Sequence, residues 1–338
     1  MATSNQAPVT PERLMQFGFA YAPPLVIGAA VKNKVFDSLL NGSKTVEQVS
    51  GETGASVRGL RAVMNALVGL ELLKKTGEKY SLVPESEAFL VDNKPGSLAG
   101  FFGMAATHLV PNWLQLADAV RTGRPPVPLN QEAPGSEFFA VLVENIIPMS
   151  YPAALALAEH LKIADSKHEM RVLDIAAGSG IWGIALAQQS PRVQVTAQDW
   201  PEMIPTTKRI VQKFGVADRL SYIKGDVLKA DFGNDYDIAT LSHILHTEGT
   251  ERSRALLKKT FNALKSGGTI AIGEWLVNDE RTEPLAGLIF AVNMLVHSEQ
   301  GDTFSFNEIK SWLEAAGFKN AHTVEAPGPS PLVLATKP

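Results

Sequence analysis

The sequence has no cysteine among its 338 residues and no excess of basic charge. Without cysteine there are no disulfides, thiolate metal ligands or cysteine nucleophiles, which agrees with the reducing cytoplasm that we expect. The formal net charge is −4, whereas proteins that bind nucleic acid or membrane surfaces are usually basic. No uncharged apolar run reaches membrane-spanning length, and no signal-peptide pattern opens the chain. We therefore expect a cytoplasmic protein with no nucleic-acid or membrane partner.

What is present is typical of a globular protein of two domains. Hydrophobic residues make up 45% of the chain and charged residues 20%, and the length allows more than one core. The Pro- and Gly-rich segment 122–135 (TGRPPVPLNQEAPG) is a loop by composition. It stands between two stretches of chain whose apolar spacing differs.

Helical spacing dominates the first stretch. Residues 12–21 and 24–40 carry apolar groups at i, i+3 and i+4, and Thr45 and Ser56 are N-cap candidates for two short helices. A polar turn and a short strand follow in KKTGEKYSLV. This order predicts a winged helix, which either binds DNA or serves as a dimerisation or lid module. The candidate recognition helix, residues 57–70, has only two basic residues, so its charge disfavours DNA.

After residue 168 short β-rich runs alternate with helical stretches. This alternation predicts a Rossmann-like, doubly wound parallel sheet with helices on both faces, in an α/β fold. The last 17 or so residues read as two strands around a Pro/Gly turn, which would add an antiparallel edge strand. The predicted parallel strands lie at 171–176, 193–200, 220–227, 236–244 and 268–277.

The first predicted βα turn contains a literal G-x-G-x-x-G. In VLDIAAGSGIWG the glycines are Gly178, Gly180 and Gly183. Glycines let the backbone turn sharply and approach a ligand closely. The pattern is the fingerprint of a dinucleotide site, but alone it also fits a βα turn that holds no ligand.

Three acidic residues follow successive strands of the predicted sheet. Asp174 precedes the glycine loop, where a carboxylate would repel a pyrophosphate but suits a cationic ligand. Asp199 is placed to accept hydrogen bonds from ribose hydroxyls. Asp226 can accept from an adenine amine, with Val227 against the ring. Together these acids favour an adenosine ligand with positive charge and no phosphate, which describes S-adenosylmethionine.

On these motifs the chain resembles the class I S-adenosylmethionine-dependent methyltransferases, from about residue 12 to 336. It is most similar to the plant-type and bacterial natural-product O-methyltransferases, which have an N-terminal winged-helix dimerisation domain. The family's Asp-hydrophobic-Gly-Gly-Gly-x-Gly loop reads DIAAGSG here, so Ala176 and Ala177 replace two glycines. Asp199-Trp200-Pro201 matches the family's Asp-Leu-Pro, and Gly225-Asp226 its Gly-Asp. A family Lys or Arg aligns with Ser242 or His243.

The resemblance also implies the chemistry and the organisation of the chain. His246 falls on the family's general base, which removes the proton of a hydroxyl, and Glu274 on the acid that orients it. No metal is needed. The family is dimeric, so we expect a homodimer acting in secondary metabolism on a small hydroxylated, aromatic or polyketide-like acceptor. The expected domains are 1–100 for dimerisation, 101–168 as a helical linker that contributes to the acceptor pocket, and 169–338 for catalysis.

Two departures from the family stand near the expected base. Thr247-Glu248 replaces the usual Asp-Trp, and Thr303 replaces a second acid, with Asp302 beside it. Some relatives of this architecture methylate carbon or nitrogen. The acceptor is expected between the two halves of the chain, against an apolar set of residues in which Asn293 needs a polar partner. The residues expected to bind it are Met149, Tyr151, Phe290, Asn293, Met294 and His297.

Three alternatives to O-methyl transfer stay open at this point. A carbon or nitrogen methyltransferase would share the whole fold. An NAD-dependent oxidoreductase would use the G-x-G-x-x-G but leaves Asp226 and the N-terminal half unexplained. A DNA-binding sensor of S-adenosylmethionine would bind duplex DNA with strong salt dependence.

Overall fold

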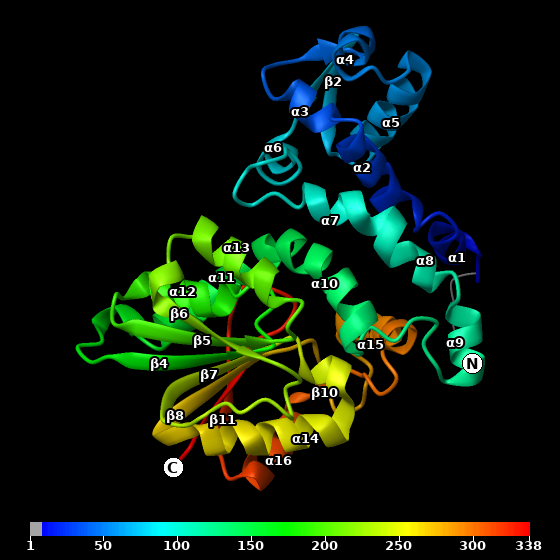
Figure 1. Cartoon of the computed structure of the whole chain (residues 1–338). Helices are drawn as coiled ribbons and strands as arrows, with labels where there is room; N and C mark the ends of the chain where they lie inside the picture. The colour runs from blue at the N-terminus through cyan, green and yellow to red at the C-terminus, as the bar shows by residue number, and fades with distance from the viewer. Residues whose placement is uncertain (1–8) are drawn as a thin grey trace, which may run out of the picture. The chain divides into compact units, whose positions relative to one another are not determined.

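The computed structural model describes residues 9–338, apart from the side chain of Pro134, and shows two compact units (Figure 1). The first unit ends at Val110 and the second runs from Pro111 to Pro338. Of the expected linker 101–168, residues 101–110 therefore belong to the first unit and the remainder to the second.

The first unit is helical, with a three-stranded sheet. Thr45 caps one helix through a capping box with Gln48, and that helix ends at the left-handed Gly54. Ser56 caps the next helix by accepting from the Gly59 amide. The expected helix 24–40 is two helices, because Lys34 takes a left-handed φ of 55° between them. The elements are α1 (Glu12–Phe17), α2 (Ala22–Lys32), α3 (Val35–Leu39), α4 (Val46–Thr53), α5 (Val57–Gly69), α6 (Pro84–Phe89), α7 (Ala99–Met104), the π-helix Ala105–Leu109, β1 (Lys44–Thr45), β2 (Leu73–Thr76) and β3 (Lys79–Leu82).

The small sheet has the order β1-β3-β2 and is antiparallel throughout. KKTGEKYSLV thus supplies two strands rather than one. Phe36, Met64, Leu67 and Tyr80 are fully buried beneath it. The expected helices are present with changed bounds, since the helix expected over 12–21 ends at Phe17, and the expected short strand belongs to this three-stranded sheet.

The second unit is a seven-stranded sheet with helices on both faces, as the alternating pattern predicted (Figure 1). One apolar core packs α14 and α16 on one face, and another packs α11, α12 and α13 on the other. The sheet order is β11-β12-β8-β7-β4-β5-β6. Its strands are β4 (Met170–Ile175), β5 (Val193–Asp199), β6 (Leu220–Lys224), β7 (Tyr236–Ser242), β8 (Leu264–Gly273), β11 (Lys319–Val324) and β12 (Leu332–Thr336). The other elements are α8 (Val110–Trp113), α9 (Leu116–Thr122), α10 (Glu132–Asn145), α11 (Ile147–His160), α12 (Ile181–Gln189), α13 (Ile204–Lys213), α14 (Leu245–Ala263), α15 (Leu285–His297), α16 (Phe306–Ala316), β9 (Leu276–Val277) and β10 (Phe304–Ser305).

Strand order reverses at β4, which pairs in parallel with β5 on one side and β7 on the other. In open α/β sheets, ligands bind beyond the carboxyl ends of the strands at such a reversal. The antiparallel β12 and β11 extend the sheet beyond β8, so the final hairpin contributes two strands at that edge.

The helical stretch Glu12–Lys32 is long and apolar enough to cross a membrane by length and composition, whereas we expected no membrane-spanning run. The bent pair Gly135–Asn145 and Ile147–His160 passes the same test jointly. Only 22% of the first stretch is buried within the unit. An exposed apolar face of this kind requires a covering surface.

Candidate active site

The glycine loop joins β4 to α12 through three left-handed residues. Ala176, Gly178 and Gly180 have φ of 51°, 55° and 73°. Gly183 is required for packing and not for the turn. A Cβ at this position would lie 2.6 Å from Val195 Cγ1, so the glycine lets α12 pack onto β5. The literal G-x-G-x-x-G is thus two loop glycines and one packing glycine.

Asp174 ties the loop to its neighbours. It is buried, with Oδ2 accepting from the Gly183 amide at 3.0 Å and Oδ1 from the Thr240 hydroxyl at 2.7 Å. Burial outweighs these two hydrogen bonds and raises its pKa to about 7. Its carboxylate therefore positions the loop, in addition to any contact with a cationic ligand.

Asp199 lies at the end of β5, beside the loop. Its oxygens accept from the amides of Gly178 at 2.6 Å and Trp200 at 2.7 Å. Burial raises its pKa to about 6 despite these bonds. The preceding Gln198, fully buried, donates to the carbonyl of Gly225 at 2.6 Å and accepts from the Ala176 amide. Gln198 braces the ends of three strands, and sequence reasoning missed it.

Asp226, two residues beyond β6, belongs to an ion-pair network. Its Oδ1 accepts from the Leu228 amide and its Oδ2 from Arg252 at 2.8 Å. Arg252 also donates to the buried Glu248 at 2.5 Å. Burial raises the pKa of Asp226, but these hydrogen bonds and the charge of Arg252 bring it below its usual value. The i, i+4 spacing of Glu248 and Arg252 was the sequence signal for this pair, while Val227 is buried in the core.

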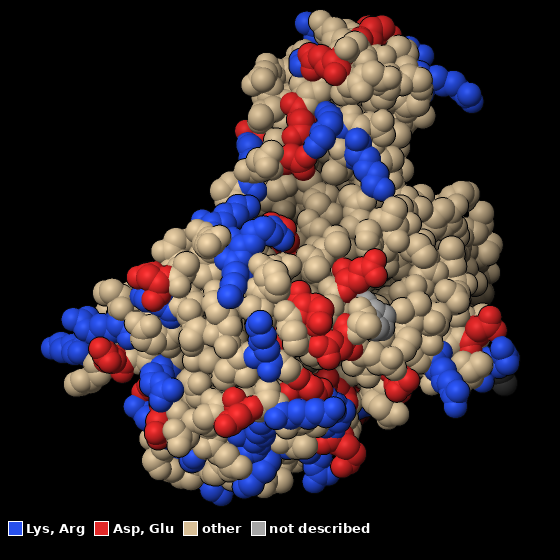
Figure 2. Space-filling view, viewed as in Figure 1, with Lys and Arg blue, Asp and Glu red and all other residues tan. Residues whose placement is uncertain are grey.

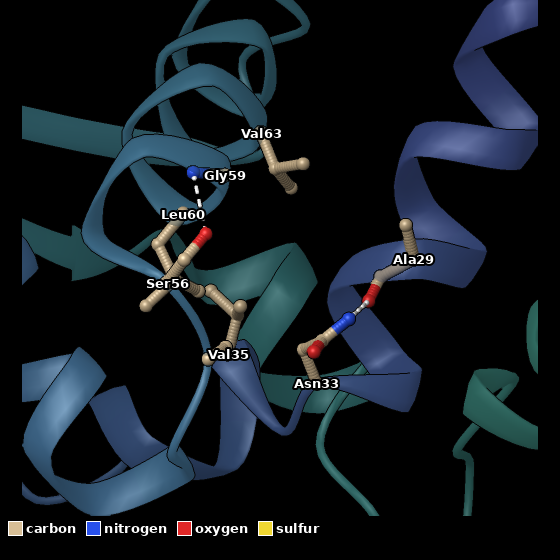
Figure 3. Close-up of a pocket in the computed structure, with 8 residues that line it drawn as sticks. Ala29, Asn33, Val35, Ser56, Gly59, Leu60 and Val63 are labelled. Atoms are coloured by element: carbon tan, nitrogen blue, oxygen red, sulfur yellow. Dashed lines mark hydrogen bonds between the residues drawn. The ribbon is translucent and has the colours of Figure 1, made fainter.

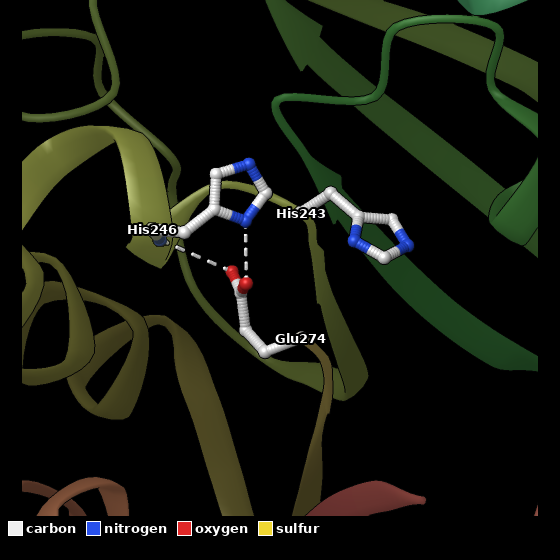
Figure 4. Close-up of side chains that lie close together, drawn as sticks. All are labelled: His243, His246 and Glu274. Atoms are coloured by element: carbon white, nitrogen blue, oxygen red, sulfur yellow. Dashed lines mark hydrogen bonds and ion pairs between the residues drawn. The ribbon is translucent and has the colours of Figure 1, made fainter. Parts of the chain in front are cut away.

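His246 and Glu274 form a buried hydrogen-bonded pair (Figure 4). They follow the adjacent parallel strands β7 and β8, and His246 Nδ1 lies 2.5 Å from Glu274 Oε2. The other oxygen accepts from the Leu245 amide at 2.7 Å. Burial alone would raise the pKa of Glu274, but the charge and hydrogen bond of His246 lower it. An ionised Glu274 accepts the proton of Nδ1, which leaves Nε2 free as a base.

His243 stands beside this pair in a left-handed backbone conformation, with a φ of 60°. Its ring centre is 5.9 Å from that of His246 (Figure 4). Burial lowers its pKa to about 4, more than the charge of Glu274 can offset. A neutral imidazole therefore occupies the region where the resembling family has a cation. Neither its Nδ1 nor the Ser242 hydroxyl has a hydrogen-bond partner in the described chain.

Hydrogen bonding, rather than metal binding, explains how His243, His246 and Glu274 are arranged. Their donor atoms lie within 4.8 Å of one another, which suits a cation by donor type. Ligand atoms around a tetrahedral zinc ion, however, are about 3.3 Å apart. The 2.5 Å between His246 Nδ1 and Glu274 Oε2 is a hydrogen-bond distance, too short for two ligands of one zinc ion.

Asp302 does not reach the His246–Glu274 pair. Its carboxylate accepts from the Thr303 amide and lies 3.5 Å from Arg281, while its backbone amide donates to the His246 carbonyl. Thr303 is buried, and its hydroxyl has no partner within residues 9–338.

Helix α15 places its polar and aromatic side chains next to His246. The Phe290 ring meets the His246 ring edge-on at 4.9 Å and stacks on Trp275 at 4.5 Å. Asn293 finds the partner it was expected to need, because its Oδ1 accepts from Trp113 Nε1 at 3.0 Å. Met294 and His297 are buried on the same helix. Sequence reasoning missed Trp275, which stacks on Phe290.

Tyr151 does not lie at this site. Its hydroxyl donates to Gln188 near the far end of α12, and its ring packs on Phe214. It belongs to the core behind the sheet because α11 packs along α12. Met149, two residues earlier, is 39% exposed.

Six buried polar atoms of the described chain have no partner, and several of them belong to segments close to His246. Leu129, next to Asn130, donates its amide to the His297 carbonyl, and the Asp302 amide donates to the His246 carbonyl. Buried polar atoms without partners are costly in proteins, so a cluster of them indicates a ligand or ordered water. The atoms are Asn130 Oδ1, Ser136 Oγ, Ser242 Oγ, His243 Nδ1, His297 Nε2 and Thr303 Oγ1.

The first unit offers no comparable chemistry in its cavity of about 210 Å³ beside α2 and α5 (Figure 3). The Asn33 side-chain amide donates to the Ala29 carbonyl, and the Ser56 hydroxyl accepts from the Gly59 amide.

The surface charge of the molecule is mixed. On the face drawn in Figure 2, acidic and basic side chains are interspersed, whereas a DNA-binding surface has charge of one sign.

Comparisons with known proteins agree with this geometry. The O-methyltransferase domain profile matches residues 113–319, and the O-methyltransferase dimerisation domain profile matches residues 15–92. The chain is 27% identical to the tetracenomycin polyketide synthesis 8-O-methyl transferase of Streptomyces glaucescens, covering 97% of each chain. It is also 27% identical to the 3-hydroxy-5-methyl-1-naphthoate 3-O-methyltransferase of Streptomyces sahachiroi, covering 91% of this chain and 90% of that one.

The fold matches that of human N-acetylserotonin methyltransferase, solved with S-adenosylmethionine. The TM-score is 0.85 at 23% identity, covering 100% of this chain and 99% of that one. These matches do not favour a nicotinamide enzyme, a DNA-binding sensor or a carbon or nitrogen methyltransferase. With a matching domain profile over most of its length, a dimerisation domain and this site, the chain belongs to the S-adenosylmethionine-dependent O-methyltransferases.

Proposed function

We propose that His246 is the general base of methyl transfer to a hydroxyl of a small aromatic acceptor, and that Glu274 orients it. The observation that carries this role is the 2.5 Å bond between His246 Nδ1 and Glu274 Oε2, at the ends of adjacent strands and beside the glycine loop. Glu274 holds the proton on Nδ1, so Nε2 takes the proton of the acceptor hydroxyl. The ionised Glu274 then stabilises the imidazolium that forms.

The cofactor residues of this proposal belong to the carboxyl ends of β4, β5, β6 and β7. S-adenosylmethionine, when bound, supplies the electrophilic methyl group. Asp199 and Trp200 would contact the ribose, and Asp226 and Val227 the adenine. The backbone of Ala176, Gly178 and Gly180 would line the methionine side, with Asp174, Ser242 and His243 close by. The left-handed loop and the unpartnered Ser242 Oγ and His243 Nδ1 support this assignment.

The acceptor would bind along α15, against Phe290, Asn293, Met294 and His297, with Met149 nearby. An aromatic acceptor suits the Phe290–Trp275 stack, and two relatives named above act in aromatic or polyketide chemistry by their names. We further propose that the protein works in the cytoplasm as a homodimer, without a nucleic-acid or membrane partner. In this proposal the first unit serves dimerisation and the second serves catalysis.

The cofactor assignment is tested by calorimetric titration with S-adenosylhomocysteine, with NADH in parallel. Micromolar binding of S-adenosylhomocysteine alone is expected. Binding of NADH alone would mean that the glycine loop holds a dinucleotide and that the three acids have other roles.

The base assignment is tested by His246→Ala. Turnover should fall by about 10²-fold or more, because one positioned base contributes that much. S-adenosylhomocysteine affinity should stay near wild type, since His246 contacts the acceptor side. Turnover close to wild type in a folded variant would refute the role of His246.

A further inference from the structure

Helix α15 presents one face along the His246 segment. Phe290, Asn293, Met294 and His297 are spaced three, four and seven residues apart, so they share that face. At one end, the Phe290 ring touches the His246 ring. At the other end, Ser298 Oγ, directly after His297, donates to the Thr247 carbonyl at 2.7 Å. Both ends of the face are therefore anchored next to the proposed base.

The hydrogen bonds of His297 determine which of its nitrogens carries the proton. Its Nδ1 lies 2.8 Å from the Asn293 backbone carbonyl, which can only accept, so Nδ1 is protonated. Burial lowers the pKa of His297, and the bond to Asn293 offsets this only in part, so the ring is neutral near pH 7. Nε2 is then a bare acceptor. It is buried on a side chain that is 5% exposed, and it has no partner in the described chain.

Asn293 supplies the complementary donor one turn earlier. Trp113 Nε1 can only donate, so it must face the amide oxygen of Asn293. This assignment orients the Asn293 side chain and leaves its Nδ2 group, which no described residue accepts from, able to donate. A donor and an acceptor thus stand one helical turn apart, with Met294 between them and Phe290 beside the base.

We propose that His297 Nε2 and Asn293 Nδ2 together bind a second hydroxyl of the acceptor, distinct from the one that is methylated. A hydroxyl donates one hydrogen bond and accepts others, so it satisfies both groups at once. The acceptors are then aromatic compounds with at least two hydroxyls, one of which goes to His246. This inference rests on the proposed function and narrows its substrate class.

Specificity of this kind has a physical basis. A buried acceptor left without a donor costs about 1–3 kcal/mol. An analogue that lacks the second hydroxyl leaves His297 Nε2 in that state, whereas an apolar pocket alone discriminates weakly against a missing hydroxyl. His297 is therefore a specificity-determining residue and takes no part in the proton transfer.

The test compares binding of dihydroxynaphthalenes and the matching naphthols to enzyme saturated with S-adenosylhomocysteine, by calorimetry. For the best isomer, the diol should bind about tenfold or more tightly than the naphthol, which corresponds to 1.4 kcal/mol or more. In His297→Leu this ratio should fall to within about threefold. His297→Gln, which keeps an acceptor oxygen, should recover part of it. S-adenosylhomocysteine binding and thermal unfolding check that each variant is folded.

A wild-type ratio near one for every isomer would overturn the proposal, and so would an unchanged ratio in His297→Leu. If His297→Leu does not fold, Asn293→Ala provides the second variant, and its ratio should also fall. The experiment involves no methyl transfer, so its outcome is independent of the His246 test. A lost diol preference with normal His246 dependence would refute only the second-hydroxyl site.

Discussion

In the proposed cofactor site, burial of the Asp199 carboxylate opposes the ionised form that its hydrogen bonds need. In the free protein, burial favours the neutral acid and raises its pKa to about 6. Ribose hydroxyls donate to a carboxylate, so ligand binding needs the ionised form. Both of its oxygens already accept one backbone amide each, and each keeps a lone pair for a further donor.

We therefore expect the affinity for S-adenosylhomocysteine to depend on pH. Above pH 7 Asp199 is ionised in the free protein and adds no pH dependence to the dissociation constant, so any change between pH 7 and pH 8 belongs to Asp174, whose pKa is about 7. Below about pH 6 the free protein holds a proton that binding must release, so affinity should fall by up to about tenfold per pH unit. Calorimetry from pH 5 to pH 8 measures this change. Asp199→Asn, which has no carboxylate to titrate, should bind weakly and without that slope, and a wild-type slope in this variant would assign the proton elsewhere.

At the same scale, the structure shows the backbone conformation or the contacts of the residues that depart from the family pattern. Ala176 takes a left-handed φ of 51° without being glycine, a conformation that costs an alanine about 1 kcal/mol. Glu248, where the family has Trp, is held by Arg252, which also reaches Asp226. The sequence showed the departures, but not that Arg252 connects one of them to the expected adenine side.

At the scale of elements, α14 carries the proposed base in its first turn and is kinked just after it. His246 stands in its first turn, and three residues later Gly249 interrupts the helix with φ 71° and ψ 176°, a region open almost only to glycine. A Cβ at Gly249 would lie 2.4 Å from the Gln300 carbonyl oxygen. The kink thus sets the path of the chain around His246.

Gly249→Ala is expected to destabilise the protein by about 3 kcal/mol or more, because backbone strain and a steric clash coincide. Turnover of the folded fraction should also fall. Gly267→Ala is the matched control: its φ is 79°, but nothing lies within 4 Å of the added Cβ. The control should lose only about 1 kcal/mol. Denaturant unfolding measures both, and equal losses would show that the contact with Gln300 relaxes freely.

At the scale of the whole molecule, the main open surface is the apolar face of the N-terminal helical stretch. Leu14, Met15, Phe17, Phe19 and Tyr21 are between 64% and 74% exposed. The dimerisation profile covers residues 15–92, which favours a second copy of the chain as the surface that covers them. If a second copy covers this face, the apolar stretch Glu12–Lys32 is an interface in the proposed dimer.

We expect the wild-type protein to have twice the 36.4 kDa chain mass by light scattering. The double variant Phe17→Ser, Phe19→Ser should shift this mass toward the monomer, since exposed aromatic groups in an interface carry much of its energy. Leu70→Ser, an exposed apolar residue at the end of α5, should remain dimeric. An unchanged dimer in the double variant would move the interface to another surface.

The sequence by itself determined the fold class, the cofactor and the reaction, all of which the comparisons confirmed. Strand and helix periodicity is a local property of the chain, and the acids after successive strands follow the chain order, so both can be read without coordinates. The helix caps at Thr45 and Ser56 were correct for the same reason.

Apart from the His246–Glu274 pair, which the family resemblance implied, only the tertiary structure decided which side chains of the site meet. Gln198, Trp275 and Arg252 contact segments distant in sequence, and Tyr151 packs against Gln188 of α12 and Phe214 just after α13. The proton position on His297 depends on a carbonyl and a buried environment that no spacing rule contains. Contacts of this kind arise only when the sheet brings distant segments together. For that reason the sequence could name residues of α15 for the proposed acceptor site, but not the hydrogen bonds that orient them.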